Sequence, residues 1–217
     1  MKRLGLLLAL CLSASAAPAF AEKAPPPAPA PAKTGAATEV VKRANDTISG
    51  LLKQKPAAGS KEEKDLAAKV TSSVRDFLDI DELGKRAMAD QWAKLKPAEQ
   101  KEFLEGLRAL IEANYVKGLR ANLDYAVSYT SETQDAAGNT IVHTTIKTKA
   151  KGRPVEIRVD YVVVKQSDKL RAFDVITDDV GLVDNYKTTF NKIMEKDGFP
   201  GLMAKIKKKQ AEVSAGG

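Results

Sequence analysis

Hydrophobic and polar side chains alternate along residues 155–165. Because successive side chains of a β-strand point to opposite faces, this alternation predicts a strand with one apolar and one mostly polar face. The apolar face carries Val155, Ile157, Val159, Tyr161 and Val163, and the other carries Glu156, Arg158, Asp160 and Val162. The apolar face needs a cover, for which the long amphipathic segment 97–123 is the expected candidate. Whether a packed core or a cavity for an apolar ligand lies between the two decides the function.

The periodicity of the rest of the chain predicts helices before and after a set of strands. Apolar residues recur at helical spacing in residues 38–55, 61–78, 81–95, 97–123, 180–196 and 199–213. Alternation predicts strands at residues 123–132, 140–150, 155–165 and 170–177, with hairpin turns at 135–139 and 166–169. Segregated runs of this kind indicate an α+β fold. We expect a four-stranded antiparallel meander covered on one face by the N- and C-terminal helices, enclosing an apolar cavity.

The first 37 residues differ from the rest in composition. Lys2 and Arg3 precede a short apolar run, and Ala-Phe-Ala at residues 19–21 fits the rule for signal-peptide cleavage. We expect a cleaved signal peptide at 1–21, a Pro/Ala-rich disordered leader at 22–37, a single domain at 38–213 and a disordered tail at 214–217. A retained N-terminal anchor is the disfavoured alternative, because the apolar run is too short to cross a bilayer. The expected location is the periplasm.

Composition and charge exclude several classes of site. The single cysteine, Cys11, lies in the predicted signal peptide, so the mature chain offers no disulfide and no thiolate. The formal charge is +7, and removal of Lys2 and Arg3 leaves +5. In an exported protein this mild excess does not indicate nucleic-acid binding. Much of it lies in the lysines of residues 205–209, for which a solvated tail is favoured over contact with an anionic membrane or an acidic partner.

Residues with catalytic potential are sparse and poorly placed for chemistry. The single histidine, His143, lies in a predicted strand without a carboxylate or nucleophile near it in sequence. Asp79 and Asp81 match no calcium loop, and Asp81 as a helix N-cap with Asp79 in a loop explains them. Asp178 and Asp179 fit the N-terminus of the following helix. Glycine-rich phosphate loops and serine elbows are absent, so we expect no enzyme activity and neither metal nor cofactor.

A set of short motifs runs through the chain in a fixed order. They are Phe77-Leu-Asp-Ile-Asp81, Met88-Ala-Asp-Gln-Trp92, Lys96-Pro-Ala-Glu-Gln-Lys-Glu-Phe103, Leu110-Ile-Glu-Ala-Asn-Tyr115, Val159-Asp-Tyr161, Phe173-Asp-Val175 and Val180-Gly-Leu-Val-Asp-Asn-Tyr-Lys187. Together they resemble the MlaC family of periplasmic phospholipid carriers, also called the toluene-tolerance auxiliary family. The resemblance covers residues 38–209, and Lys187 stands where the family often has arginine.

The resemblance implies a soluble periplasmic carrier that holds a phospholipid by its acyl chains. Such carriers shuttle lipid between an outer-membrane lipoprotein complex and an inner-membrane ABC transporter complex, and we expect a monomer. The helical stripe and the inward strand residues would form the walls, and Tyr186 and Lys187 would meet the head group. The expected lipid-binding residues are Trp92, Phe103, Leu107, Leu110, Ile111, Val127, Ile157, Val159, Tyr161, Phe173, Val175, Val183, Tyr186, Lys187 and Phe190.

Two alternatives stay open at this level. The same architecture could bind another hydrophobic compound, such as a hopanoid or a quinone. The apolar side chains could also simply pack on one another, which would leave an adaptor protein that binds a transporter through its surface.

Deletion of residues 22–33 is expected to leave folding unchanged, because a Pro/Ala-rich stretch buries no core. Thermal melts of the mature and the truncated chain, followed by circular dichroism, test this. A broader or lower transition in the truncated chain would show that the leader is structural.

Overall fold

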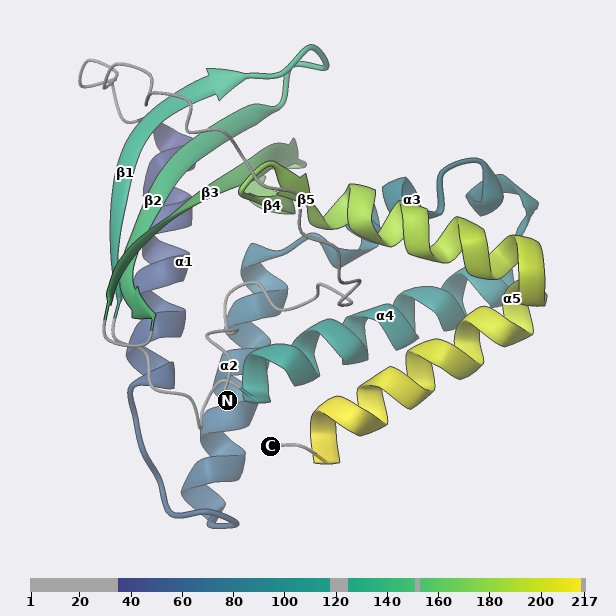
Figure 1. Cartoon of the computed structure of the whole chain (residues 1–217), viewed down its shortest axis with the longest axis horizontal. Helices are drawn as coiled ribbons and strands as arrows, with labels where there is room; N and C mark the ends of the chain where they lie inside the picture. The colour runs from purple at the N-terminus through teal and green to yellow at the C-terminus, as the bar shows by residue number, and fades with distance from the viewer. Residues whose placement is uncertain (1–34, 118–124, 151–152, 216–217) are drawn as a thin grey trace.

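The computed structural model describes residues 35–117, 125–150 and 153–215 (Figure 1). The predicted signal peptide and most of the predicted leader lie outside these ranges. The first helix begins at Ala36, two residues earlier than predicted. Within the described ranges, no helix combines the length and the hydrophobicity needed to cross a bilayer.

Five strands form one antiparallel sheet whose spatial order follows the sequence. They are β1 (Tyr125–Gln134), β2 (Thr140–Ala150), β3 (Arg153–Gln166), β4 (Lys169–Thr177) and β5 (Val180–Gly181). The α+β class and the meander are confirmed, but the sheet has five strands where four were predicted. Asp178 and Asp179 make the tight turn into β5 with φ of 44° and 71°, a conformation that aspartate adopts more readily than most residues.

Six helical segments complete the described fold. They are α1 (Ala36–Leu52), α2 (Lys61–Phe77), α3 (Ile80–Met88), the 3-10 helix η1 (Ala89–Lys94), α4 (Pro97–Lys117) and α5 (Leu182–Ala215). α5 bends at Gly198, whose φ of 64° lies outside the helical region, so its halves correspond to the two helices predicted on either side of this glycine. α5 continues through Ala215, two residues into the predicted tail.

The N-terminal caps of two helices come from side chains that the sequence placed only partly. Ser60 Oγ accepts from the backbone N–H of Glu63 at 3.1 Å and begins α2. Asp79, and not the predicted Asp81, caps α3 by accepting from the backbone N–H of Glu82 at 3.1 Å. Asp81 instead pairs with Arg108 of α4. The misassignment arises because carboxylates two residues apart fit the same cap pattern.

The carboxylates around β5 also differ from their predicted roles. Asp178 Oδ1 accepts from the backbone N–H of Arg158 at 3.3 Å, and Asp179 pairs with the Arg158 guanidinium. Neither residue lies at a helix N-terminus, because β5 intervenes before α5. The N-terminus of α5 is held instead by Asp174, whose Oδ1 accepts from Val183 N at 3.1 Å.

The two faces of the sheet separate as the alternation predicts along residues 153–160 of β3, whereas Tyr161, Val162 and Val163 are all buried. Val159 is fully buried and Tyr161 is 4% exposed. Val142 of β2 stands opposite Tyr161 and is also buried. Glu156 and Arg158 are exposed on the other face.

The cover of the inward face is α1, and the prediction that the long helix α4 covers it was wrong. α1 lies along the concave side of the curved strands and contacts β1, β2 and β4 (Figure 1). α4 packs mainly on α5, α2 and α3, and Tyr115 near its C-terminal end reaches the strands. The amphipathic pattern of α4 indicates that one face is buried, but it does not identify the buried partner.

The N-terminus of α1 is held by a side chain from the edge strand. Glu132 Oε1 of β1 accepts from the backbone N–H groups of Gly35 at 2.9 Å and Thr38 at 2.6 Å. Gly35, at the N-cap, has no side chain with which to satisfy these donors. Glu132 therefore takes the role of a cap and joins α1 to the sheet.

Replacement of Glu132 by alanine is expected to lower the free energy of unfolding by about 1–2 kcal/mol, because it leaves two helix N–H groups without their acceptor. Urea unfolding measures the change. Glu105→Ala is the control, since Glu105 makes only an exposed pair with Lys101 at 3.9 Å and should change stability by less than about 0.5 kcal/mol. Equal losses in the two variants would contradict the assigned cap.

Candidate functional site

A small cavity of about 10 Å³ lies where α1, the C-terminal ends of α2 and α4, and the strands meet. It has room for about one water molecule. Its walls come from six elements: α1, α2, α4, β1, β3 and β4. The lining residues are Asn45, Ile48, Phe77, Tyr115, Tyr125, Tyr161 and Val175. The cavity therefore marks the junction between the α1-covered sheet and the remaining helices.

A polar network crosses this junction. Asn45 of α1 donates through Nδ2 to the Tyr129 hydroxyl at 3.2 Å, and its Oδ1 accepts from the Tyr161 hydroxyl at 3.2 Å. The hydroxyl of Tyr125 hydrogen-bonds with Ser49, one turn further along α1. A single helix face is thus joined to β1 and β3 by side-chain hydrogen bonds as well as by apolar contacts.

The tyrosines at the junction stay neutral at physiological pH. Burial raises the pKa of Tyr115 to about 12, and burial also raises the pKa of Tyr161 and of Tyr186. Each hydroxyl therefore remains a hydrogen-bond donor. Among the described side chains, the buried hydroxyl of Tyr186 has no hydrogen-bond partner.

Four of the residues predicted to bind lipid form a column of aromatic rings among the helices. The ring centroids of Trp92 and Phe103 are 6.3 Å apart, and those of Phe103 and Phe190 are 5.4 Å apart, both edge-on. Tyr186 stacks on Phe190 at 4.9 Å. These distances are typical of favourable aromatic pairs, so the column joins η1, α4 and α5.

The other predicted residues are distributed over several environments. Tyr161 and Val175 line the cavity. The core buries Leu107, Leu110, Ile111 and Val159, whereas Val127, Ile157 and Val183 are half-buried at its edge. Phe173 packs under the Arg86 guanidinium, 4.0 Å from its ring centroid, and Lys187 is exposed.

The sequence-based site therefore omitted most of the cavity wall. Asn45, Ile48, Phe77, Tyr115 and Tyr125 line the cavity but were not among the predicted residues. The sequence does carry a sign of these residues. Tyrosine occurs at inward positions where phenylalanine would satisfy the apolar pattern. An asparagine on the apolar stripe of α1 is a second signal of the same kind.

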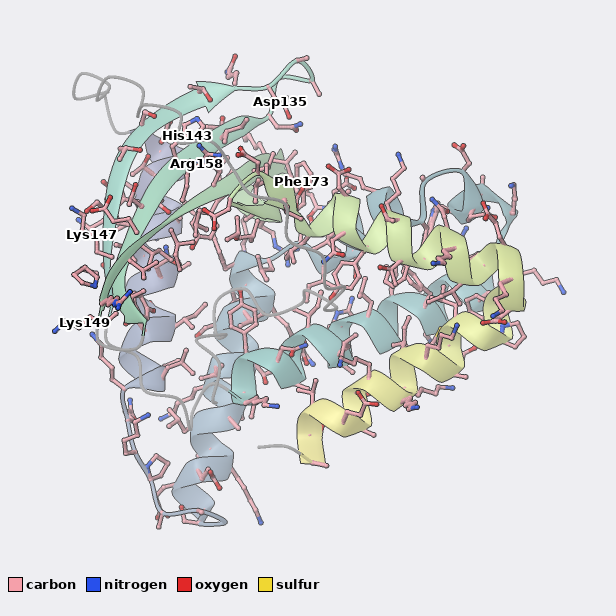
Figure 2. The ribbon with its side chains drawn as sticks, viewed as in Figure 1. Asp135, His143, Lys147, Lys149, Arg158 and Phe173 are labelled. Carbon is pink, nitrogen blue, oxygen red and sulfur yellow. The ribbon has the colours of Figure 1, made fainter. Side chains whose placement is uncertain are left out.

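His143 has partners that the sequence did not reveal. Its Nδ1 lies 3.0 Å from Asp160 Oδ1, and its Nε2 lies 2.8 Å from the Thr133 hydroxyl. These side chains belong to the outward face of the sheet, where Lys147 and Lys149 also project away from α1 (Figure 2). The histidine is thus separated from the cavity by the sheet itself. In the part of the chain that the structure describes, no group of three or more His, Cys, Asp or Glu is arranged to hold a metal ion.

A second depression, of about 150 Å³, lies beside the N-terminus of α3. Its three arginines face carboxylates: Arg108 pairs with Asp81, Arg75 with Glu112, and Arg171 lies 3.7 Å from Asp79. Arg171 also donates to the backbone oxygen of Leu78 at 2.7 Å. Charge is balanced among these pairs, and Arg171 joins β4 to the segment between α2 and α3.

The lysines near the C-terminus are largely engaged in ion pairs. Lys205 lies 2.6 Å from Asp197, and Lys207 lies 2.9 Å from Glu102 of α4. Lys209 lies 3.3 Å from Glu212. These pairs reduce the local positive field available to an anionic membrane surface.

Replacement of Phe190 by alanine is expected to destabilise the protein by about 3–5 kcal/mol, because it removes one of the two inner rings of the aromatic column. Lys187→Ala, one turn earlier on the exposed face, should change stability by less than about 0.5 kcal/mol. Chemical denaturation of both variants gives the comparison. A small effect at Phe190 would mean that the column contributes little to folding.

Comparison with known proteins identifies the family to which this fold belongs. The family profile described as "MlaC protein" matches residues 42–208. A solved structure of the phospholipid-binding protein from Ralstonia solanacearum in complex with a phospholipid superposes with a TM-score of 0.65 at 22% sequence identity, covering 82% of this chain and 98% of that chain. Among curated proteins, none matches the sequence. The profile covers most of the chain, and the fold agrees with it: this protein belongs to the MlaC family.

Proposed function

We propose that this protein binds a two-chain phospholipid between its sheet and its helices and carries it through the periplasm. Membership of the MlaC family supports this, together with a fold shared with the Ralstonia solanacearum protein that holds a phospholipid. The cavity at the junction of sheet and helices is the position at which the ligand would enter.

The physical need for a carrier is large. Two long acyl chains contain roughly 30 methylene groups, each worth about 0.8 kcal/mol when removed from water, so their transfer is worth roughly 24 kcal/mol. A free phospholipid therefore crosses an aqueous compartment extremely slowly. A protein that shields the chains lowers this barrier without any chemical step, so no catalytic group is required.

Binding requires the layers to separate. The cavity volume of about 10 Å³ is far below the roughly 300–1,000 Å³ of typical ligand sites. β1 and β2 are covered chiefly by α1, whereas β4 makes the main contacts of the sheet with α2, α3 and α5 (Figure 1). We propose that the wall formed by α1, β1 and β2, which also packs on α2 through α1, moves away from the C-terminal end of α4.

The proposed carrier would exchange its lipid with membrane complexes. The expected partners are an inner-membrane ABC transporter complex, which would supply any energy, and an outer-membrane lipoprotein complex. On the described surface the exposed large hydrophobic residue is Val180, at 52% exposure. Docking to either partner would therefore rely on polar contacts, which suits transient binding.

Lipid extraction of the purified protein, followed by mass spectrometry, tests the function. The expected result is a two-chain phospholipid at close to one molecule per protein. A hopanoid or a quinone in its place would indicate a carrier of a different ligand. A protein free of lipid, even after incubation with phospholipid vesicles, would identify a packed adaptor instead.

The variant Ile157→Glu is expected to lose the copurified lipid, because it places a charge on the inward face of β3 at a half-buried position. Lys207→Ala should retain it, since Lys207 only pairs with Glu102 on the surface. Circular dichroism checks that both variants are folded. Equal lipid content in the two folded variants would contradict the position of the site.

A further inference from the structure

The tyrosines of this protein are concentrated at one place. The chain has five tyrosines, and three of them, Tyr115, Tyr125 and Tyr161, line the cavity. The hydroxyls of Tyr129 and Tyr161 bond the same asparagine, Asn45. Tyr186 is close enough to Tyr115 for the two to interact electrostatically. All five therefore belong to one cluster, which we call the tyrosine cluster.

A site that held only hydrocarbon chains would not need hydroxyl and amide groups in its walls. Four of the seven residues that line the cavity carry a polar group, namely the three tyrosines and Asn45. Burial of a hydroxyl without a partner costs about 1–3 kcal/mol, so buried tyrosine hydroxyls normally have one. The Tyr186 hydroxyl is buried and unpartnered in the described structure, and Tyr115 acts on it electrostatically. The Tyr186 hydroxyl is thus a described donor of the cluster that lacks an acceptor, and a ligand that brings one would complete it.

The charges around the cluster select the kind of acceptor. The charged side chain that acts on Tyr125 and Tyr129 is Asp46, which is negative. The groups that act on Tyr161 are Asn45 and other tyrosines, which are neutral. Among the described residues, a phosphate would meet the negative charge of Asp46, whereas a neutral carbonyl oxygen would find the unpartnered Tyr186 hydroxyl as a donor.

We propose that the tyrosine cluster binds the ester carbonyl oxygens of the lipid, between its acyl chains and its head group. The inference rests on the proposed function, because it names the part of the phospholipid that this cluster recognises. Ester carbonyls are neutral acceptors joined directly to the apolar chains, so they enter the junction when the chains do. The phosphate then stays outside the cluster, in contact with water.

Ether-linked lipids distinguish the hydrogen bonds to the ester carbonyl oxygens from the apolar contacts of the chains. A dialkyl ether phospholipid has the same head group and chain length as the diacyl ester, but it lacks both carbonyl oxygens. The mature protein is incubated with vesicles that contain equimolar diacyl and dialkyl phosphatidylglycerol, and the bound lipids are quantified by mass spectrometry. The wild type should take up the ester about fivefold or more in excess, which corresponds to the loss of one or two neutral hydrogen bonds.

Tyr186→Phe should reduce this excess by about threefold or more while leaving uptake of the ether lipid unchanged. The variant should also melt at the same or a higher temperature than the wild type, because it removes an unpartnered buried hydroxyl from the empty protein. Thr130→Val is the matched control: its hydroxyl donates to the backbone oxygen of His143 on the outward face, so its loss should leave the ester preference intact.

Equal uptake of ester and ether lipids by the wild type would overturn this inference and leave the carrier function standing. An ester preference that is unchanged in Tyr186→Phe, or a melting temperature well below that of the wild type, would overturn the role of this hydroxyl. Uptake of neither lipid would overturn the proposed function and this inference together.

Discussion

Burial of the concave face of the sheet under α1 is the constraint on which the rest of the structure depends. Val142 and Val159 are fully removed from water there, and each such side chain is worth about 1.5–3 kcal/mol. α1 is held in place at its first turn by Glu132 and in its middle by Asn45. Because these bonds have fixed geometry, they determine how the helix sits on the strands as well as how strongly it is bound.

With α1 as the cover, α4 is free to build a second layer with α3 and α5. This layer has its own internal contacts, of which the aromatic column through Phe103 and Phe190 is the clearest. The two parts meet at the tyrosine cluster, where polar groups take a share of the contact surface. The proposed entry of a ligand at this junction agrees with these polar contacts, which water can replace when the parts separate.

The sequence predicted the helices and strands well, but it predicted less well which of them pack against one another. Alternation around Val159 and helical spacing along α2 and α4 identified strands and helices because these patterns are local. The partner of α4 was wrong, since amphipathicity reports burial but not the surface that supplies it. Asp79 and Asp81 were exchanged as caps because both fit one pattern. The walls of the candidate site were predicted from the apolar pattern, and Tyr186 and Lys187 came from the family resemblance, so Asn45 and Tyr125, whose polarity sets the junction apart, were omitted.

The small size of the cavity follows from the same energetics that make lipid binding favourable. An empty apolar cavity costs about 24 cal/mol per Å³, so a permanent one of roughly 300 Å³ would cost roughly 7 kcal/mol. The total stability of a domain is only about 5–15 kcal/mol. Under the proposed function, the protein would therefore close when it holds no lipid and open as the acyl chains replace its own contacts. By the same measure the space of about 10 Å³ lined by Tyr115 and Tyr161 costs less than about 1 kcal/mol, which the domain tolerates.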